Sequence, residues 1–223
     1  MIPSFAARRP TAQARHITSA AVLYGVLVAL ACTPRAGALR GTPAPARFPQ
    51  AELPPGHKRV VFRWEYSDQA LGAKGEGAAR VAPPDSARLD FFLDGGVAGG
   101  FAIVVGDSVS TPGGNDVRRY LPPPSFLWAA LGRLAIPPLP DTVAKVDGTT
   151  LWADIGRNPT WRIAFVGDQL TRVERIVDGR RIEWVTRSGS EIRYRHERSL
   201  RSLTLRITST DAAAPFDSTI WRR

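Results

Sequence analysis

From His57 onward, hydrophobic residues recur mainly at every second position. The run Val60–Tyr66, for example, alternates apolar with polar side chains from Phe62 onward, which is typical of a half-buried β-strand. Tight-turn residues separate such runs, and the clearest turn is Asp178-Gly179, a dipeptide that strongly favours a β-hairpin. The pattern predicts an antiparallel meander with strands at residues 60–66, 74–81, 88–94, 100–105, 109–111, 151–154, 161–166, 170–177, 181–186, 191–196 and 202–208.

The spacing of the hydrophobic residues changes once, directly after the three prolines 122–124. Leucines then recur at helical spacing across Ser125–Leu134. Ser125 is suited to cap the N-terminus of a helix, and Gly132 is suited to end it. We therefore predict a mainly β fold, built as an open and curved antiparallel sheet, with one or two short helices around Ser125–Leu131.

The alternation also divides the side chains between two faces of the sheet. Eight aromatic residues fall on one set of positions: Phe62, Trp64, Phe91, Phe101, Trp161, Phe165, Trp184 and Tyr194. Many arginines fall on the other set: Arg63, Arg88, Arg162, Arg193, Arg195 and Arg206. This predicts an apolar concave face and a solvated convex face. We expect the scattered strand carboxylates to be solvated rather than paired: Asp90, Asp94, Glu174 and Glu183.

The first 31 residues have the layout of a secretory signal peptide. Three arginines precede a compact apolar stretch, Ala20–Ala31, and no acidic residue occurs among them. A membrane-spanning helix is the alternative, but it needs roughly 20 apolar residues and this stretch has about 12. We therefore predict that residues 1–31 direct export and are removed.

The chain contains one cysteine, Cys32, which directly follows this stretch. Val28–Ala31 before it resembles a loose bacterial lipobox, and an exported chain without a second cysteine offers no disulfide partner. We predict that Cys32 is lipidated and anchors the protein to the periplasmic side of a membrane. Thr33 stands where an aspartate in such lipoproteins favours the inner membrane, which points to the outer membrane. An ordinary signal peptide cut elsewhere, for instance after Ala38, is the alternative.

Residues 32–56 are rich in proline and alanine, and residues 57–223 carry the regular pattern. A segment of the first kind buries too little apolar surface to offset its ordering entropy. We predict a lipidated and disordered tether over 32–56, followed by one β domain over 57–223.

The net charge of +10 comes mainly from arginine, without a dense basic run or a nucleic-acid motif. We interpret this charge as a solvated face, with anionic lipid headgroups as an alternative partner, and we expect no nucleic acid. Three histidines, one of them in the predicted signal, give no metal-ligand spacing. No glycine-rich loop joins a strand to a helix in the manner of a phosphate site. We expect neither a metal nor a cofactor.

The order of these features resembles the LolA/LolB superfamily of lipoprotein carriers and receptors. The resemblance covers about residues 57–210, and it rests most on the helical segment Ser125–Pro137 and the closing strand Arg201–Ile207. It implies an unclosed antiparallel β-barrel over a hydrophobic cavity that receives acyl chains, with short helices as a lid. On this basis we predict a monomer that binds lipid or acyl chains, in lipid or lipoprotein transport or in envelope biogenesis.

The predicted cavity is lined by residues from both halves of the meander: Phe62, Trp64, Phe91, Leu93, Phe101, Ile103, Trp161, Phe165 and Trp184. The predicted lid consists of Phe126, Leu127 and Leu131. The alternative is that these side chains fill one another. The chain would then be a non-catalytic scaffold that contacts other envelope proteins through its arginine-rich face or its aromatic end, Ile220–Arg223.

One segment resembles an enzyme motif. Phe101–Ser108 is similar to the first block of the SGNH hydrolases, and residues 113–116 are similar to their Gly-x-Asn-Asp block. The two blocks are too close together in sequence, however. The closing Asp-x-x-His motif of that family is also missing, because the residue three positions before His196 is Arg193. A serine without a base has no route to activation. We therefore predict that the chain is not an enzyme and that Gly106-Asp107-Ser108 forms a turn.

Overall fold

The computed structural model describes residues 35–49, 52–95, 98–112, 118, 120–137 and 139–221. The predicted signal peptide, Cys32, Thr33 and the Gly-x-Asn-Asp block at 113–116 lie outside these residues. Within the described residues, the search for a helix long and apolar enough to cross a membrane finds none.

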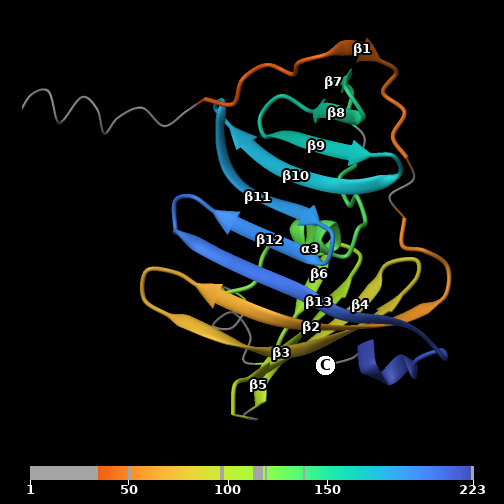
Figure 1. Ribbon diagram of the computed structural model, residues 1–223, viewed down its shortest axis with the longest axis vertical. Helices are drawn as coiled ribbons and strands as arrows, with labels where there is room; N and C mark the ends of the chain where they lie inside the picture. The colour runs from red at the N-terminus through yellow and green to blue at the C-terminus, as the bar shows by residue number, and fades with distance from the viewer. Residues whose placement is uncertain are drawn as a thin grey trace, which may run out of the picture. The chain divides into compact units, whose positions relative to one another are not determined.

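Thirteen antiparallel strands form one curved sheet (Figure 1). Their order across the sheet is β1-β7-β8-β9-β10-β11-β12-β13-β2-β3-β4-β5-β6, and no described pairing joins β1 to β6, so the sheet stays open. The prediction of a mainly β, unclosed antiparallel fold is therefore confirmed. The strands are β1 (Thr42–Ala44), β2 (His57–Ser67), β3 (Gly72–Ala82), β4 (Ser86–Leu93), β5 (Ala98–Val105), β6 (Ser108–Ser110), β7 (Thr142–Asp147), β8 (Thr150–Ile155), β9 (Thr160–Val166), β10 (Gln169–Val177), β11 (Arg180–Ser188), β12 (Glu191–His196) and β13 (Arg201–Ala213).

Two hairpin meanders, β2–β6 and β7–β13, make up most of the sheet, and the pairing of β13 with β2 joins them. This pairing runs from Ser202 opposite Ser67 to Ala213 opposite His57. The predicted turn at Asp178-Gly179 is present: both residues have positive φ, 51° and 73°. Such angles match a type I′ turn, whose twist fits the strands on either side of it.

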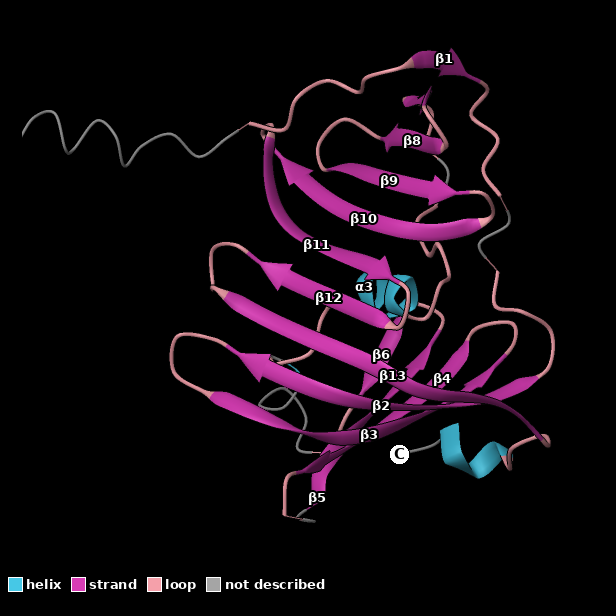
Figure 2. Cartoon of the chain, in the orientation of Figure 1, coloured by secondary structure: helices cyan, strands magenta, loops and turns pink. Residues whose placement is uncertain are grey.

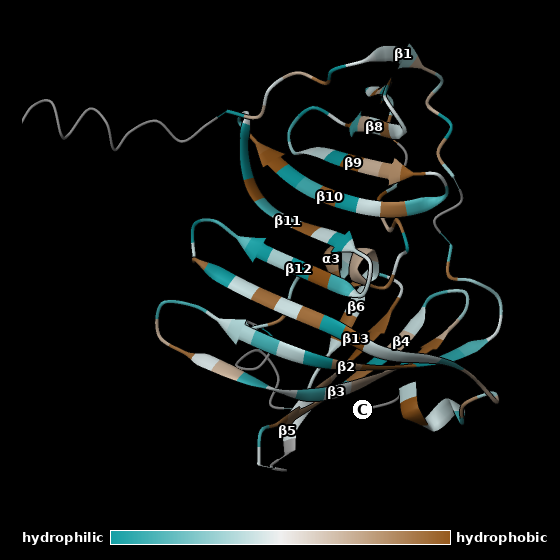
Figure 3. Ribbon diagram, viewed as in Figure 1, coloured by the Kyte–Doolittle hydropathy of each residue, from teal (hydrophilic) through white to brown (hydrophobic). Residues whose placement is uncertain are grey.

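Helix α3 (Pro124–Ala130) lies between the meanders in sequence and against one face of the sheet in space (Figure 2). We call this face the inner face; it carries Leu89, Val173 and Val185, which belong to one apolar core with α3. Hydrophobic and polar residues alternate along the strands (Figure 3), as expected for a sheet that buries one side. The opposite side is called the outer face.

The alternation does not predict β1 or β7. β7 exposes Val143 and Val146 and contributes Ala144 to the core, so its apolar residues do not mark a single face. β1 lies inside the segment predicted to be a disordered tether, and it pairs with β7, with Pro43 opposite Lys145.

Other contacts hold the same segment against the sheet. Lys145 Nζ donates to the backbone oxygen of Leu39 at 3.0 Å, and the ring of Phe48 stacks on Phe165. Leu53 is only 7% exposed. In its described part, 35–49 and 52–56, the expectation of a disordered tether is therefore wrong. Apolar residues scattered among the prolines provide enough buried contact to order the segment.

The described end of the chain covers part of the outer face. The 3₁₀-helix η1 (Ser218–Trp221) contacts β4 and β5, and Arg88 Nη1 donates to the backbone oxygen of Ile220 at 3.4 Å. Trp221 packs edge-on against Phe216, whose ring in turn meets His57. The aromatic end is therefore attached to the sheet, at least as far as Trp221.

Candidate functional site

Two prolines set the N-terminus of α3. Pro124 is the first helical residue, a position where the missing N–H of proline costs nothing. The backbone oxygen of Pro123 accepts from the N–H groups of Phe126 and Leu127 at 3.0 and 3.1 Å. The predicted cap at Ser125 is therefore wrong: Ser125 is already helical, and Pro123 is the N-cap residue without a side-chain hydrogen bond.

The C-terminus of α3 ends in a Schellman motif. Gly132 has φ +92° and donates to Ala129 O, while Arg133 N donates to Trp128 O at 2.9 Å. Gly132 was the residue expected to end the helix, and this prediction is confirmed. A side chain here would also collide with the guanidinium of Arg187.

Helix α3 contacts strands that lie far apart in the sheet. Phe126 packs against the rings of Trp161 on β9 and Tyr194 on β12, with centroids 5.5 and 5.7 Å apart. Trp128 Nε1 donates to the oxygen of Gly106, in the β5–β6 turn, at 2.6 Å. Five consecutive residues, Phe126–Ala130, are buried, so α3 is covered on all sides.

Two glycines on β3 shape the inner face next to the helix. A side chain on Gly77 would collide with the ring of Phe62, and one on Gly75 would collide with the backbone of Phe92. These glycines let Phe62 and Trp64 lie close over the strand. Trp64 Nε1 can thereby donate to backbone oxygens of β3 and β4, at 2.9 and 3.2 Å.

Three cavities follow one another along the inner face beneath α3. The first, of about 190 Å³, is named the basic cavity, after two cations in its wall; it is lined by Leu53, Pro54, Lys58, Val60, Phe62, Ala79, Val81, Leu89, Ala130, Leu131, Arg187, Ile192, Leu205, Ile207 and Thr210. The central cavity, of about 20 Å³, is lined by Leu89, Phe91, Pro122, Phe126, Leu127, Ala130, Leu131, Ile192, Tyr194, Leu203 and Leu205. The aromatic cavity, again about 190 Å³, is lined by Trp64, Tyr66, Leu71, Ala73, Phe91, Leu93, Gly99, Gly100, Phe101, Tyr120, Leu121 and Leu203.

The three cavities share walls. Leu89, Leu131 and Leu205 line both the basic and the central cavity. Phe91 and Leu203 line both the central and the aromatic cavity. The three spaces are therefore neighbours, and each shared side chain is the wall between two of them.

The predicted lining residues divide into three groups. Four of them line the cavities from the inner face: Phe62, Trp64, Phe91 and Leu93; Phe101 also touches one cavity, from an outward-facing position. Trp161 and Phe165 are on the inner face but pack against Phe126 and Phe48, outside the cavity walls. The three predicted lid residues all line the central cavity: Phe126, Leu127 and Leu131.

The remaining three predicted residues point to the outer face. Ile103 pairs with Arg88 and is 3% exposed where η1 contacts β5, so it is not part of the inner core. Phe101 touches the aromatic cavity, but its ring lies under the Arg88 guanidinium, 4.1 Å from the centroid. Trp184 stacks under Arg181 at 3.9 Å. Placing Ile103 and Trp184 in the cavity was wrong, because alternation does not say which set of positions faces inward.

The inner face also holds a polar network that the sequence does not predict. Glu183 is 1% exposed, and its carboxylate accepts from Arg175 Nε at 2.6 Å and from the Tyr194 hydroxyl at 2.7 Å. Arg201 Nη2 donates to the same hydroxyl at 3.1 Å. Burial, reinforced by the Glu183 charge, raises the pKa of Tyr194. The expectation that Glu183 is solvated is therefore wrong.

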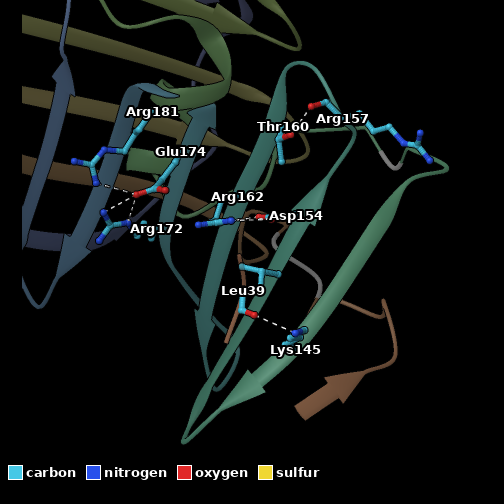
Figure 4. A network of polar contacts seen from close by, with 9 residues as sticks. All are labelled: Leu39, Lys145, Asp154, Arg157, Thr160, Arg162, Arg172, Glu174 and Arg181. Carbon is cyan, nitrogen blue, oxygen red and sulfur yellow. Dashed lines mark hydrogen bonds and ion pairs between the residues drawn. The ribbon is translucent and has the colours of Figure 1, made fainter. Parts of the chain in front are cut away.

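On the outer face, ion pairs run across neighbouring strands (Figure 4). Arg162 makes two bonds to Asp154, at 2.7 and 2.8 Å. Glu174 accepts from Arg172 at 2.7 Å and from Arg181 at 3.3 Å, and it is 5% exposed. Glu174, like Glu183, is therefore paired rather than solvated, because arginines from neighbouring positions cover it.

The other two carboxylates expected to be solvated are Asp90 on β4 and Asp94 in the turn that follows β4. Asp90 accepts from Arg80 at 2.6 Å and from Arg88 at 2.9 Å, so the expectation is wrong for Asp90. Asp94 lies 3.7 Å from Lys74, with both side chains more than half exposed. Asp94 lines a larger outer-face hollow of about 600 Å³, whose walls are largely charged. An exposed ion pair such as Lys74–Asp94 contributes little to the stability of the fold. We do not regard the hollow as the candidate site, because its walls are largely charged.

Of the two hydrolase-like blocks, only the first, Phe101–Ser108, lies among the described residues. Ser108 starts β6 in a tight antiparallel hairpin, opposite Val105. His196 lies on β12 and contacts the hydroxyl of Ser199. Among the described residues, no group of three potential metal ligands is present.

In sequence, the chain matches no protein-family model and no curated protein. In structure, it is similar to a LolA superfamily protein from Nitrosomonas europaea, with a TM-score of 0.51, 9% identity and coverage of 79% of this chain and 92% of that one. It is also similar to a domain from Vibrio parahaemolyticus described as an outer membrane lipoprotein-sorting protein domain, with a TM-score of 0.53, 7% identity and coverage of 77% and 92%. The chain therefore has a LolA-like fold, as its sequence predicts.

Proposed function

We propose that this chain is an exported, membrane-anchored protein that binds an acyl chain or another apolar part of a lipid beneath α3. The observation that carries the proposal is the row of three apolar cavities with shared walls. The fold supports it, because one similar structure is described as a lipoprotein-sorting domain. We further propose that the chain acts in lipid or lipoprotein transport or in envelope biogenesis, and that it is not an enzyme.

An acyl chain fits the chemistry of this site. Each of the two larger cavities, at about 190 Å³, is smaller than the ~300–1,000 Å³ that is common for ligand pockets. A flexible chain can thread from one cavity to the next where a rigid ligand cannot. Each methylene removed from water contributes about 0.8 kcal/mol. The walls supply apolar contact along the whole route, with Leu131 shared by the basic and central cavities and Phe91 shared by the central and aromatic cavities.

The anchor proposal rests on Cys32, which lies outside the described residues. Ala36 N donates to Gly179 O at 2.8 Å, so the sheet holds the chain four positions after Cys32. Four residues span at most about 14 Å. A lipidated Cys32 would therefore hold the domain close to the membrane, which we propose is the outer membrane. Mass spectrometry of the mature N-terminal peptide tests this: a diacylglyceryl and acyl mass is expected on Cys32, and an unmodified Cys32 would contradict the anchor.

The binding proposal is tested with the full chain carrying Cys32→Ser, exported and purified without detergent. Organic extraction followed by mass spectrometry is expected to find bound lipid. After delipidation, the fluorescent fatty acid cis-parinaric acid is expected to bind saturably. Leu131→Trp places a large ring in both the basic and the central cavity, and we expect it to weaken binding about tenfold.

Val143→Trp is the matched control, because Val143 is 56% exposed on β7. It adds the same ring away from the site and should leave the affinity unchanged. Absence of both extractable lipid and saturable binding would refute the proposal and support a scaffold with a filled core. Equal weakening by the two substitutions would show that the cavities beneath α3 are not the site.

A further inference from the structure

Arg187 is placed unlike the other described arginines of the sheet's inner face. Arg175 and Arg201 both belong to the network around Glu183 and Tyr194. Arg187 extends from the other end of β11, toward Gly132 at the C-terminal end of α3. Its neighbour across the strand pair is Ile192, and both line the basic cavity.

No acceptor for Arg187 occurs among the described residues. None of the hydrogen bonds and ion pairs between them involves its guanidinium, and Nε is shielded from solvent without a partner. Burial lowers the pKa of Arg187, and no described carboxylate offsets this effect. Arg187 as a whole is partly buried, and a cation that is even partly removed from water is costly unless an anion pairs with it.

The basic cavity supplies what an acidic lipid head needs. Lys58 gives its wall a second positive charge, and none of its lining residues is acidic. The other lining side chains are apolar apart from Thr210, and five of the lining residues also line the central cavity. Positive charge therefore occurs at one end of the row of apolar spaces, beside the C-terminal end of α3.

We infer that the basic cavity binds the carboxylate of a fatty acid, with Arg187 as the partner of that carboxylate and the acyl chain directed into the central cavity. The planar guanidinium presents paired N–H donors that match a carboxylate. A cavity of about 190 Å³ that must also admit the chain favours this small head over a complete phospholipid headgroup. The inference rests on the proposed function, because it names the lipid class for the same site.

The test compares cis-parinaric acid with its methyl ester, which has the same chain but no charge. With the delipidated Cys32→Ser chain, the acid is expected to bind about tenfold more tightly than the ester. Arg187→Gln is expected to abolish this preference by weakening the acid alone, and Arg187→Lys is expected to restore part of it. Arg195→Gln, on the outward-facing positions of β12, is the matched control and should keep the preference.

The ratio of acid to ester affinity separates this role from a structural one. If Arg187 only stabilised the end of α3, its substitution would weaken both ligands equally. Equal binding of acid and ester by the wild-type chain would overturn the inference and leave the proposed function standing. Binding of neither ligand would overturn both. Displacement of the acid by a lysophosphatidate of equal chain length at much lower concentration would show that the head is a phosphate, and the carboxylate assignment would be wrong.

Discussion

At the scale of single residues, polar groups inside the fold are matched with partners on neighbouring strands. Glu183 on β11 meets Arg175 on β10 and Tyr194 on β12, and Phe126 of α3 packs on the Tyr194 ring. Burying a carboxylate is tolerated only with such partners. The network therefore fixes the register of three strands directly beneath the helix, where an apolar contact would tolerate a shift.

Glu183→Gln should lower the free energy of unfolding by about 2 kcal/mol. Breaking a buried ion pair costs roughly 3–5 kcal/mol, and we lower this value because the Arg175 side chain is 33% exposed. Urea denaturation followed by circular dichroism measures the change. Glu197→Gln is the control: its side chain is 42% exposed, and the expected change is within about 0.5 kcal/mol. Equal effects of the two substitutions would show that the network does not stabilise the fold.

The raised pKa of Tyr194 predicts that the fold loses stability at alkaline pH. Its pKa is raised above the ordinary value of 10.0, first by burial and then by Glu183, so the folded chain keeps the phenolic proton to higher pH than the unfolded chain does. The unfolded chain thus binds fewer protons above pH 10, and the free energy of unfolding falls as the pH rises. Tyr194→Phe should make this fall less steep, while Tyr66, whose pKa burial also raises, retains its own share. Identical slopes in urea denaturation series between pH 9 and 12 would contradict the assignment.

At the scale of elements, helix α3 is defined by its ends. Pro123 and Pro124 start it, and the positive φ of Gly132 stops it within two turns. Seven residues are too few for a stable isolated helix. Its stability must therefore come from the buried contacts of Phe126–Ala130, which connects the helix to the cavities that the same residues line.

Gly132→Ala should destabilise the chain more than the same change at Gly189. Both glycines have positive φ, +92° and +58°, so both substitutions carry backbone strain of about 1 kcal/mol. Gly189 has open space around it, whereas a Cβ on Gly132 collides with Arg187. We expect a total of about 2 kcal/mol at Gly132 by urea denaturation. The excess should shrink when Arg187→Gln is combined with Gly132→Ala, and an unchanged excess would mean that the Arg187 contact does not matter.

Regular elements of the meander could be predicted because one face of each strand is buried. The alternation of apolar and polar residues predicts the ends of β2, β4 and β9 to within a few residues. It fails for β7, whose short strand exposes two valines, and for β1, which is held by pairing with β7 rather than by any pattern of its own.

Which of a strand's two faces points inward could not be predicted from the residues of that strand alone. On β11, Glu183, Val185 and Arg187 face inward, while Ile182 and Trp184 face outward. The alternation alone favours the opposite assignment, because it places the larger apolar side chain inside. Pairing with Tyr194 on β12 decides it, and this contact exists only once the sheet is assembled. The basic end of the cavity row could not be predicted for the same reason.

At the scale of the whole described chain from residue 36 onward, the β13–β2 pairing joins two meanders into one curved sheet, and α3 contacts both of them. The central strands are paired on both sides, whereas β1 and β6 form the two edges and span three residues each. Stability is therefore unevenly distributed: the centre of the sheet can open only with the whole fold. The helix, by contrast, is held by side-chain packing on β10–β12 and by the Trp128 hydrogen bond to Gly106, without any strand pairing.

Hydrogen exchange measured with and without a fatty acid tests this division of the molecule. Without ligand, the amides of β11–β13 and β2 should exchange most slowly, and those of the edge strands β1 and β6 most rapidly. Oleate bound beneath α3 would fill the spaces next to Phe126–Leu131, so the α3 amides should gain protection while those of β7 and β8 change little. Protection that rises uniformly over the sheet would instead indicate global stabilisation by mass action, without a local change at the helix. In that case the helix would be a fixed part of the core, and the three cavities would have to admit a chain from another side.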